Sequence, residues 1–164
     1  MNIFVLDETP KKAARMLCDC HLHKMCVETS QILSAVLVKH NTELLKKMPN
    51  YQKANHPVIV ALYENDAALD WVLAYNHALH FEYYHRFRKA HAYSDLTMEY
   101  ISLLWSGTEG DCSGLKKCCG NLKVRGMDIV SAYRKYYTEV KKPQLTAKNL
   151  WKFTNRKDWT NEQN

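Results

Sequence analysis

The chain has 164 residues, of which 46% are hydrophobic and 24% charged, and its net charge is +6. This length suits one domain with its own core and is too short for two of ordinary size; ten Tyr, four Trp and four Phe exclude a chain that is disordered throughout. No apolar run approaches the ~18 residues of a membrane span, and Asp7 falls where a secretory signal would have its apolar core. We therefore expect one domain over residues 1–164, with no membrane partner.

Helical periodicity dominates the apolar residues, and period-2 alternation is missing apart from a short segment, Ile3–Leu6. Thr9 and Pro10 are residue types typical of a helix N-cap and first turn. All five glycines lie between Gly107 and Gly126, which predicts a loop with special backbone angles. In chain order we expect a helix from Pro10 to about His40 that bends near Cys18–Cys20, a connector over 41–56, a short helix from Pro57, a long helix capped by Asp66 and running to about His91, the loop, a helix over about 127–140, and a last short helix or turn carrying Trp151. The predicted fold is all-α, a single-domain orthogonal helical bundle of about five or six helices with a Gly-rich loop at 107–126.

Two stripes of residues divide the predicted helix over residues 20–39. Spacings of four and three define a core stripe: Leu22, Cys26, Thr29, Leu33 and Val36. A polar stripe lies at its edge: His21, Lys24, Glu28 and Gln31. A carboxylate at such an edge can act as an acid or base, and an imidazole and an ammonium one turn away can position an anionic substrate. The same spacing is typical of a solvated face with a Lys24–Glu28 ion pair, so both interpretations stay open.

The long helix predicted over residues 66–91 has apolar bulk all round, which indicates a central helix of the bundle. Asn76 and His80 are polar groups on its main apolar face, so each needs a partner in the core or in a substrate. Its histidines also invite a metal interpretation, but the two Glu-x-x-His helices of a carboxylate di-metal bundle are missing. We predict no metal ligand and no cofactor, and keep as an alternative a metal-dependent helical enzyme that uses His77, His80 and Glu82.

Six cysteines lie at positions 18, 20, 26, 112, 118 and 119. With no secretory signal in view, we expect reduced thiols. The groups 18/20 and 112/118/119 could meet around a zinc ion, but the usual C-x-x-C spacing is absent. We therefore interpret these cysteines as small buried hydrophobic side chains.

Basic and aromatic residues alternate in the C-terminal part, residues 116–164. Twelve basic side chains against four acidic ones leave +8 there, whereas residues 1–115 carry −2. A basic segment on a near-neutral body is typical of a protein that binds nucleic acid. Cations contact phosphates and flat rings stack on exposed bases, which makes Arg134, Tyr136, Trp151 and Lys152 candidate substrate-binding residues. The alternative is that one side of the 127–140 helix packs in the core while its lysines extend to solvent.

The segment from Leu17 to Val36 contains a longer pattern, Asp-x-His-x-x-Lys-Met-x-x-Glu-[Thr/Ser]-x-Gln-[Leu/Ile]-Leu, which begins at Asp19. Together with Asn55-His56-Pro57, the stretch from Glu82 to His91 and the run Ala132-Tyr133-Arg134-Lys135-Tyr136-Tyr137, it resembles a group of small phage-encoded proteins of unassigned role. The resemblance covers most of the chain. It implies a protein of the cytoplasm of an infected bacterial host.

The same segment is similar to pyrimidine-dimer DNA glycosylases of the endonuclease V type. These small, basic, helical enzymes carry Asp-Gln-His-Leu near the N-terminus and a catalytic Glu seven residues after that His; here Asp19-Cys20-His21-Leu22 is followed by Glu28. In that family the N-terminal α-amine attacks C1′ of the damaged nucleotide and forms a Schiff base, and the Glu stabilises charge at the sugar and aids proton transfer. The resemblance implies that Glu28 takes the role of this Glu, that His21 contacts the DNA backbone and that Met1 supplies the nucleophile.

Three departures accompany this resemblance. The family exposes a Thr after loss of its initiator Met, whereas Asn2 favours retention of Met1. Val27 and Gln31 stand where the family has arginines, which leaves Lys24 for phosphate contacts, and the loop at 107–126 has no counterpart in that family.

Residues and resemblance together predict a DNA-binding glycosylase and AP lyase for damaged or modified pyrimidines, with Glu28 and Met1 as its catalytic residues. The predicted substrate-binding residues are His21, Lys24, Gln31, Asn76, His80, Arg134, Tyr136, Trp151 and Lys152. The alternative from another class is a non-catalytic module that binds nucleic acid or a host protein through the basic C-terminal part.

Overall fold

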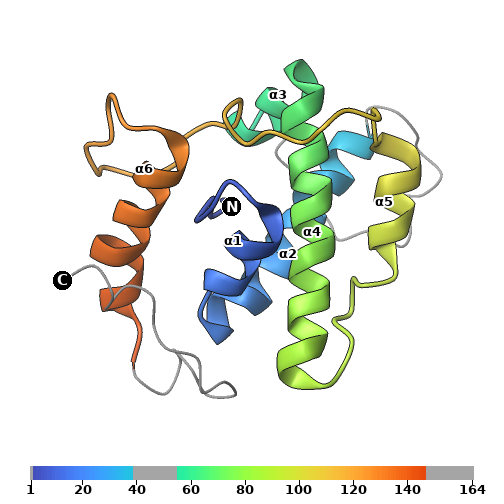
Figure 1. Ribbon diagram of the computed structural model, residues 1–164, viewed down its shortest axis with the longest axis horizontal. Helices are drawn as coiled ribbons and strands as arrows, with labels where there is room; N and C mark the ends of the chain where they lie inside the picture. The colour runs from blue at the N-terminus through green and yellow to red at the C-terminus, as the bar shows by residue number, and fades with distance from the viewer. Residues whose placement is uncertain (1, 39–54, 147–164) are drawn as a thin grey trace.

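Six α-helices and two shorter helical turns make up the part of the chain that the computed structural model describes, residues 2–38 and 55–146, and these ranges contain no strand (Figure 1). The elements are α1 (Pro10–Met16), α2 (Asp19–Val38), α3 (Pro57–Glu64), α4 (Asp66–Phe87), α5 (Leu96–Leu104), α6 (Ile129–Tyr136), a π-helical turn η2 (Tyr137–Lys141) and a 3-10 turn η3 (Lys142–Gln144). The predicted all-α helical bundle is confirmed. Within the two ranges, each helix is too short or too polar to cross a membrane.

The helix predicted over residues 10–40 is two helices rather than one bent helix. Leu17, which follows α1, has an extended backbone (φ −69°, ψ 140°), and α2 begins at Asp19. The guanidinium of Arg86 donates hydrogen bonds to the carbonyl oxygens of Leu17 (2.7 Å) and Arg15 (2.9 Å). Since helix ends leave carbonyl groups without intrahelical partners, this buried cation stabilises the break.

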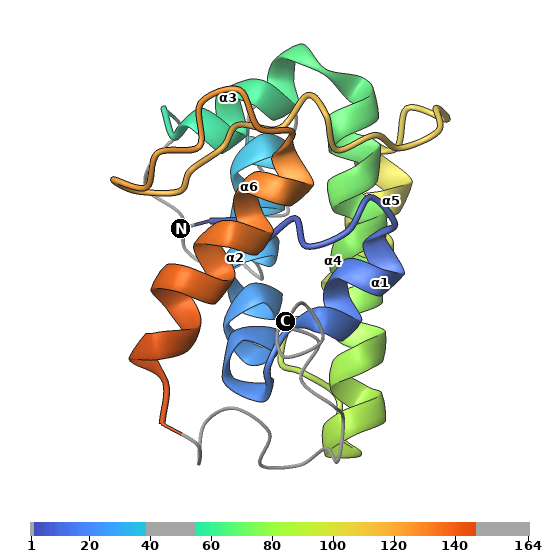
Figure 2. The ribbon, with the colours of Figure 1, turned by 60° about the vertical axis from the view of Figure 1, so that its left-hand side comes forward.

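The central helix α4 starts where predicted, but its cap and its end differ from the prediction. The side chain of Asn65, not Asp66, accepts the backbone N–H of Ala68 at 2.9 Å, as an N-cap does. The helix ends before His91 because Arg88 adopts a left-handed backbone with φ 54°. Its neighbours are α1, α2, α3 and α5, so α4 is central as expected (Figure 2).

The other boundaries follow the prediction in part. α3 begins at Pro57, and α6 with η2 covers the helix predicted over 127–140. α5 was not predicted as a separate element. Most of the connector at 41–56 and the terminal helix or turn carrying Trp151 lie outside the described residues.

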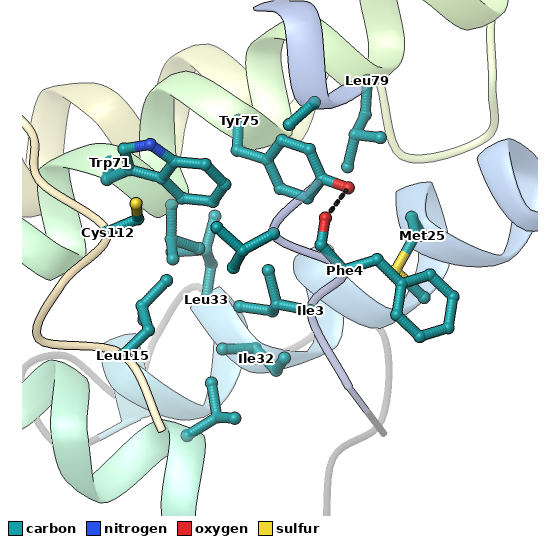
Figure 3. Packing of buried hydrophobic residues seen from close by; sticks show 14 of the residues in the cluster. Ile3, Phe4, Met25, Ile32, Leu33, Trp71, Tyr75, Leu79, Cys112 and Leu115 are labelled. Atoms are coloured by element: carbon teal, nitrogen blue, oxygen red, sulfur yellow. Dashed lines mark hydrogen bonds between the residues drawn. The ribbon is translucent and has the colours of Figure 1, made fainter. Parts of the chain in front are cut away.

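The N-terminal segment Ile3–Leu6 is neither helix nor strand and passes through the core, with each residue at most 2% exposed. Figure 3 shows Ile3 and Phe4 beside side chains of both α2 and α4. The Tyr75 hydroxyl donates to the carbonyl oxygen of Phe4 at 3.1 Å. The Phe4 ring also contacts three tyrosine rings of α6 and η2: Tyr133, Tyr136 and Tyr137. These contacts fix the position of the residues at the start of the chain.

The Gly-rich segment at 107–126 is a loop, as predicted, and it has no helix or strand. Gly107, Gly120 and Gly126 have positive φ, the conformation that glycine adopts without cost. Gly110 has another role: a Cβ there would lie 2.7 Å from the backbone nitrogen of Trp71, so this glycine permits close packing on α4. The loop links α5 to α6 across the α3 end of the molecule (Figures 1 and 2).

Candidate functional site

The carboxylate of Glu28 binds the start of the chain. Its Oε2 accepts the backbone N–H of Asn2 at 2.8 Å, a contact between residues 26 positions apart. Glu28 lies in the middle of α2, and its side chain is 13% exposed. The prediction that Glu28 lies at the edge of the buried face is confirmed. This contact brings the N-terminal end of the main chain to a carboxylate.

Asn2 is held on three further sides. Its Nδ2 donates to the carbonyl oxygen of Cys118 (2.7 Å), and its Oδ1 accepts from the Tyr133 hydroxyl (2.7 Å) and from the backbone N–H of Ile3 (2.9 Å). The Tyr133 hydroxyl also accepts the N–H of Cys118 at 3.1 Å. Burial raises the pKa of Tyr133, so its hydroxyl keeps its proton and remains a donor to Asn2. The loop and α6 therefore position the residue that faces Glu28.

Two further residues of the predicted polar stripe flank Glu28. Lys24 Nζ lies 3.6 Å from Glu28 Oε1, and the Lys24 side chain is 56% exposed. Gln31 lies one turn further along α2 and is half-buried. The structure thus brings Lys24, Glu28 and Asn2 together, with the largely exposed ammonium of Lys24 next to the carboxylate.

His21, the first residue of that stripe, points into the protein. The side chain is buried, and its Nδ1 lies 3.0 Å from the Tyr137 hydroxyl and 3.3 Å from Cys18 Sγ. Phe4 and Tyr137 contact the ring edge-on at centroid distances of 5.3 and 5.2 Å. Contact of His21 with a DNA backbone stays a prediction; the structure shows a packed imidazole.

Two candidates from the C-terminal part support the N-terminal segment. Arg134 donates to the carbonyl oxygen of Leu6 (2.7 Å) and to the Asp7 carboxylate (3.1 Å). Tyr136 is 8% exposed and packs near Phe4. Their described contacts are with the protein itself. The other candidates, Met1, Trp151 and Lys152, lie outside the described residues.

Asn76 and His80 lie in the core and not beside Glu28. Asn76 is 0% exposed; its Nδ2 donates to Thr29 and Ser30, and its Oδ1 accepts from Thr97 at 3.1 Å. Asn76 has therefore found its partners within the bundle, the alternative that the sequence left open. Its complete burial gives a substrate no access to it in this structure.

His80 belongs to a separate cluster of rings. Its Nε2 lies 3.4 Å from Ser30 Oγ, its Nδ1 has no hydrogen-bond partner among the described residues, and its ring centroid is 5.2 Å from that of His91. Burial lowers the pKa of His80 to about 3 and that of His91 to about 4, so both are neutral at pH 7. This is a packing arrangement rather than a solvent-facing site.

The alternative of a metal centre built from His77, His80 and Glu82 does not match the geometry. Glu82 Oε1 is bound by Arg86 at 2.8 Å. Glu82 and exposed His77 line one surface groove, but buried His80 does not line it. In the described part of the chain, the side chains that could hold a metal ion are instead Cys18, Cys20 and His21. The two cysteine groups do not meet, since Cys112, Cys118 and Cys119 are absent from this cluster.

Sequence reasoning missed three residues that shape the site: Asn2, Tyr133 and Tyr137. In the sequence, Asn2 bears only on removal of the initiator methionine. The tyrosines were noted as aromatic residues between cations, which is compatible with either stacking on bases or core packing. Their contacts with Asn2 and His21 span more than 100 residues, and no local pattern encodes them.

The fold and this site define a class: an all-helical protein in which a buried N-terminal segment brings its main-chain nitrogen to a carboxylate of a long helix. The model of one family, described as pyrimidine dimer DNA glycosylase, matches residues 1–95, and the chain belongs to this family. Membership implies DNA as the substrate and a function of the DNA-glycosylase type. No curated protein and no solved structure gave a significant match.

The matched region contains Asn2, Lys24 and Glu28, together with α1 to α4. The residues that anchor Asn2 from the other side, Cys118 and Tyr133, lie beyond residue 95. The catalytic candidates thus lie within the family region, and the rest of this chain completes their surroundings.

Proposed function

We propose that this protein is a DNA glycosylase with AP-lyase activity, which removes damaged or modified pyrimidines through its N-terminal amine and Glu28. The observation that carries the proposal is the 2.8 Å contact between the Asn2 nitrogen and Glu28 Oε2. The α-amine of Met1 is one residue away from this nitrogen along the chain. If the initiator methionine is removed, the Asn2 nitrogen itself becomes the α-amine and already touches the carboxylate.

The chemistry starts with the neutral amine, whose ordinary pKa of ~7.7–8 leaves a useful unprotonated fraction near pH 7. The amine nitrogen forms a bond to C1′ of the nucleotide, the bond from C1′ to the base breaks, and the base leaves with the electron pair. Glu28 accepts the proton that the amine loses. Opening of the C1′–O4′ bond then gives the Schiff base, and Glu28 passes its proton to the O4′ alkoxide and so becomes a carboxylate again.

Strand cleavage uses the same carboxylate. Removal of a proton from C2′ of the Schiff base lets the bond from C3′ to its phosphate oxygen break, with the phosphate leaving as an anion. Water then releases the sugar from the amine. Lys24, largely exposed beside Glu28, is suited to bind a DNA phosphate near the reacting sugar.

The test is strand incision of an end-labelled duplex that contains one cyclobutane thymine dimer, with an abasic duplex and an undamaged duplex beside it. We expect wild type to incise the first two duplexes only. Glu28→Gln is expected to lose activity about 100-fold or more while its DNA affinity, measured by fluorescence anisotropy, stays within a few-fold. Intact mass and N-terminal sequencing of the same sample establish which residue carries the α-amine.

Glu139→Gln is the matched control, because Glu139 also forms an i,i+4 ion pair with a lysine, Lys135, and its side chain on η2 is 48% exposed. It should retain wild-type incision. Equal activity in Glu28→Gln and wild type would refute the proposed role of Glu28. Tight binding to DNA with no incision of either lesion by wild type would instead support the non-catalytic binding module.

A further inference from the structure

Two thiols and an imidazole meet at the start of α2, and the chemistry proposed above uses neither thiol. Cys18 Sγ lies 3.5 Å from Cys20 Sγ and 3.3 Å from His21 Nδ1. The three ligand atoms all lie within 4.8 Å of one another. Across residues 2–38 and 55–146, no other group of three or more His, Cys, Asp or Glu side chains converges in this way.

These separations are close to those of a zinc site. With Zn–S bonds of about 2.3 Å and Zn–N bonds of about 2.0 Å, tetrahedral angles place two sulfur atoms about 3.8 Å apart and sulfur and nitrogen about 3.5 Å apart. The two separations given above are each within about 0.3 Å of these values. For these two pairs, a zinc ion requires only small movements of the side chains.

The charge balance suits the buried position. Cys18 is 1% exposed and His21 7% exposed, and burial of an uncompensated charge is costly. A divalent cation with two thiolates and a neutral imidazole has no net charge. The adjacent carboxylate of Asp19 already has a cation, since Arg86 Nη1 lies 3.1 Å from its Oδ1. Cys20 is half-buried, so the site borders solvent on one side.

Outer contacts already orient these ligands. The Tyr137 hydroxyl accepts the backbone N–H of Cys18 at 2.9 Å. Its 3.0 Å contact with His21 Nδ1 engages the nitrogen that would bind the ion, so this contact gives way when the ion binds. Phe4 packs against the His21 ring from another side. Hydrogen-bonding and packing partners of this kind hold metal-ligating side chains in position. The bond to the Cys18 N–H also connects the start of α2 to η2.

We propose that Cys18, Cys20 and His21 bind a zinc ion through two thiolates and one imidazole, with a water or other small ligand in the fourth position. The ion links residues 18–21 to one another at the start of α2. Its binding is independent of the proposed glycosylase reaction, because no step of that reaction passes through the ion.

The test is a titration of the full chain, free of tags, stripped of metal and fully reduced, with Co²⁺ under inert gas. We expect one Co²⁺ per chain, thiolate-to-cobalt charge-transfer bands in the near ultraviolet, and displacement by Zn²⁺ but not by Mg²⁺. Zn²⁺ should also raise the Tm, because an ion that binds only the folded chain stabilises it.

Cys20→Ser is the informative variant, since Cys20 is only half-buried at the edge of the core and serine has nearly the same shape as cysteine. It should weaken Co²⁺ binding about 100-fold or more and abolish the rise in Tm. Cys118→Ser, a change at another half-buried cysteine, should bind Co²⁺ as wild type does. Absence of charge-transfer bands in the reduced wild type, or unchanged Co²⁺ affinity in Cys20→Ser, would overturn the proposal.

Discussion

Replacement of Arg86 by Met tests the arrangement that separates α1 from α2. The Arg86 side chain is 0% exposed and donates to two carboxylates and two carbonyl oxygens, those of Glu82, Asp19, Leu17 and Arg15, at 2.7 to 3.1 Å. Methionine fills a similar volume but cannot donate. The Glu82 and Asp19 side chains, 6% and 5% exposed, would lose this buried cation.

The expected cost is large. Removing one partner of a buried ion pair destabilises proteins by about 3–5 kcal/mol, because the remaining charge stays buried. We expect Arg86→Met to lower the free energy of unfolding by about 4 kcal/mol in urea titrations at pH 7. Adding Glu82→Gln to Arg86→Met should recover part of the loss, since it neutralises one of the carboxylates left behind.

Arg134→Met provides the comparison. Arg134 also pairs with a carboxylate and a carbonyl oxygen, but its side chain is 34% exposed, and such pairs contribute about 1 kcal/mol or less. A loss of unfolding free energy below about 1 kcal/mol for Arg86→Met, or an equal loss for both variants, would show that burial does not determine how much each ion pair stabilises the protein.

Three further predictions concern the buried histidines His80 and His91, the contact that holds Asn2, and the Gly-rich loop. Folding lowers the pKa values of His80 and His91, so below pH 6.5 the unfolded chain binds more protons than the folded one, and the free energy of unfolding decreases as the pH is lowered from about 6.5 to 4. Urea titrations should show a loss of about 2 kcal/mol for each histidine between pH 7 and pH 5. A free energy of unfolding that does not change over this range would contradict the prediction. Tyr133→Phe removes the hydroxyl that donates to Asn2. In steady-state incision assays it should lower kcat about tenfold with little change in KM. An unchanged kcat would count against a positioning role of Tyr133. Gly110→Ala should lower the free energy of unfolding by about 3 kcal/mol, because its Cβ would collide with the backbone of α4. Gly120→Ala should lower it by about 1 kcal/mol, because Gly120 has φ +60° but no heavy atom within 4 Å of the added Cβ. Thermal unfolding compares the two variants, and a larger loss for Gly120→Ala would refute the packing role of Gly110.

Local periodicity was sufficient to predict α2 and the position of Glu28 on it. All five residues of the predicted core stripe are buried, and Glu28 lies at the edge as expected. This worked because burial on a long amphipathic helix follows from spacing alone. Local backbone preference was likewise sufficient to place Pro57 at the start of α3 and the glycines in the loop.

Features that depend on distant partners could not be predicted in this way. The break between α1 and α2 is stabilised by Arg86, about 70 residues later in the chain. Asn76 is satisfied by two residues of α2 and one of α5, so its spacing could not distinguish a core role from a substrate role. α5 has only nine residues and exposes Met98 and Leu103, which removes the amphipathic signal by which a helix is recognised.

The contact between Asn2 and Glu28 is the central example. The resemblance pointed to Glu28 and to an N-terminal amine, but it did not show that the loop and α6 hold the start of the chain against α2. That arrangement depends on residues 118 and 133, which lie outside the region that the family model matches. It follows from tertiary packing and not from the motif.

Borohydride trapping directly detects a Schiff base between the N-terminal amine and DNA. The protein would be mixed with ultraviolet-irradiated, abasic and undamaged duplexes, reduced with sodium borohydride and separated on a denaturing gel. We expect a covalent protein–DNA band with the first two duplexes, which is lost when extra residues precede Met1 or when the α-amine is chemically blocked. No trapped band on either lesion, or a band of equal intensity from the blocked protein, would contradict an N-terminal amine nucleophile facing Glu28.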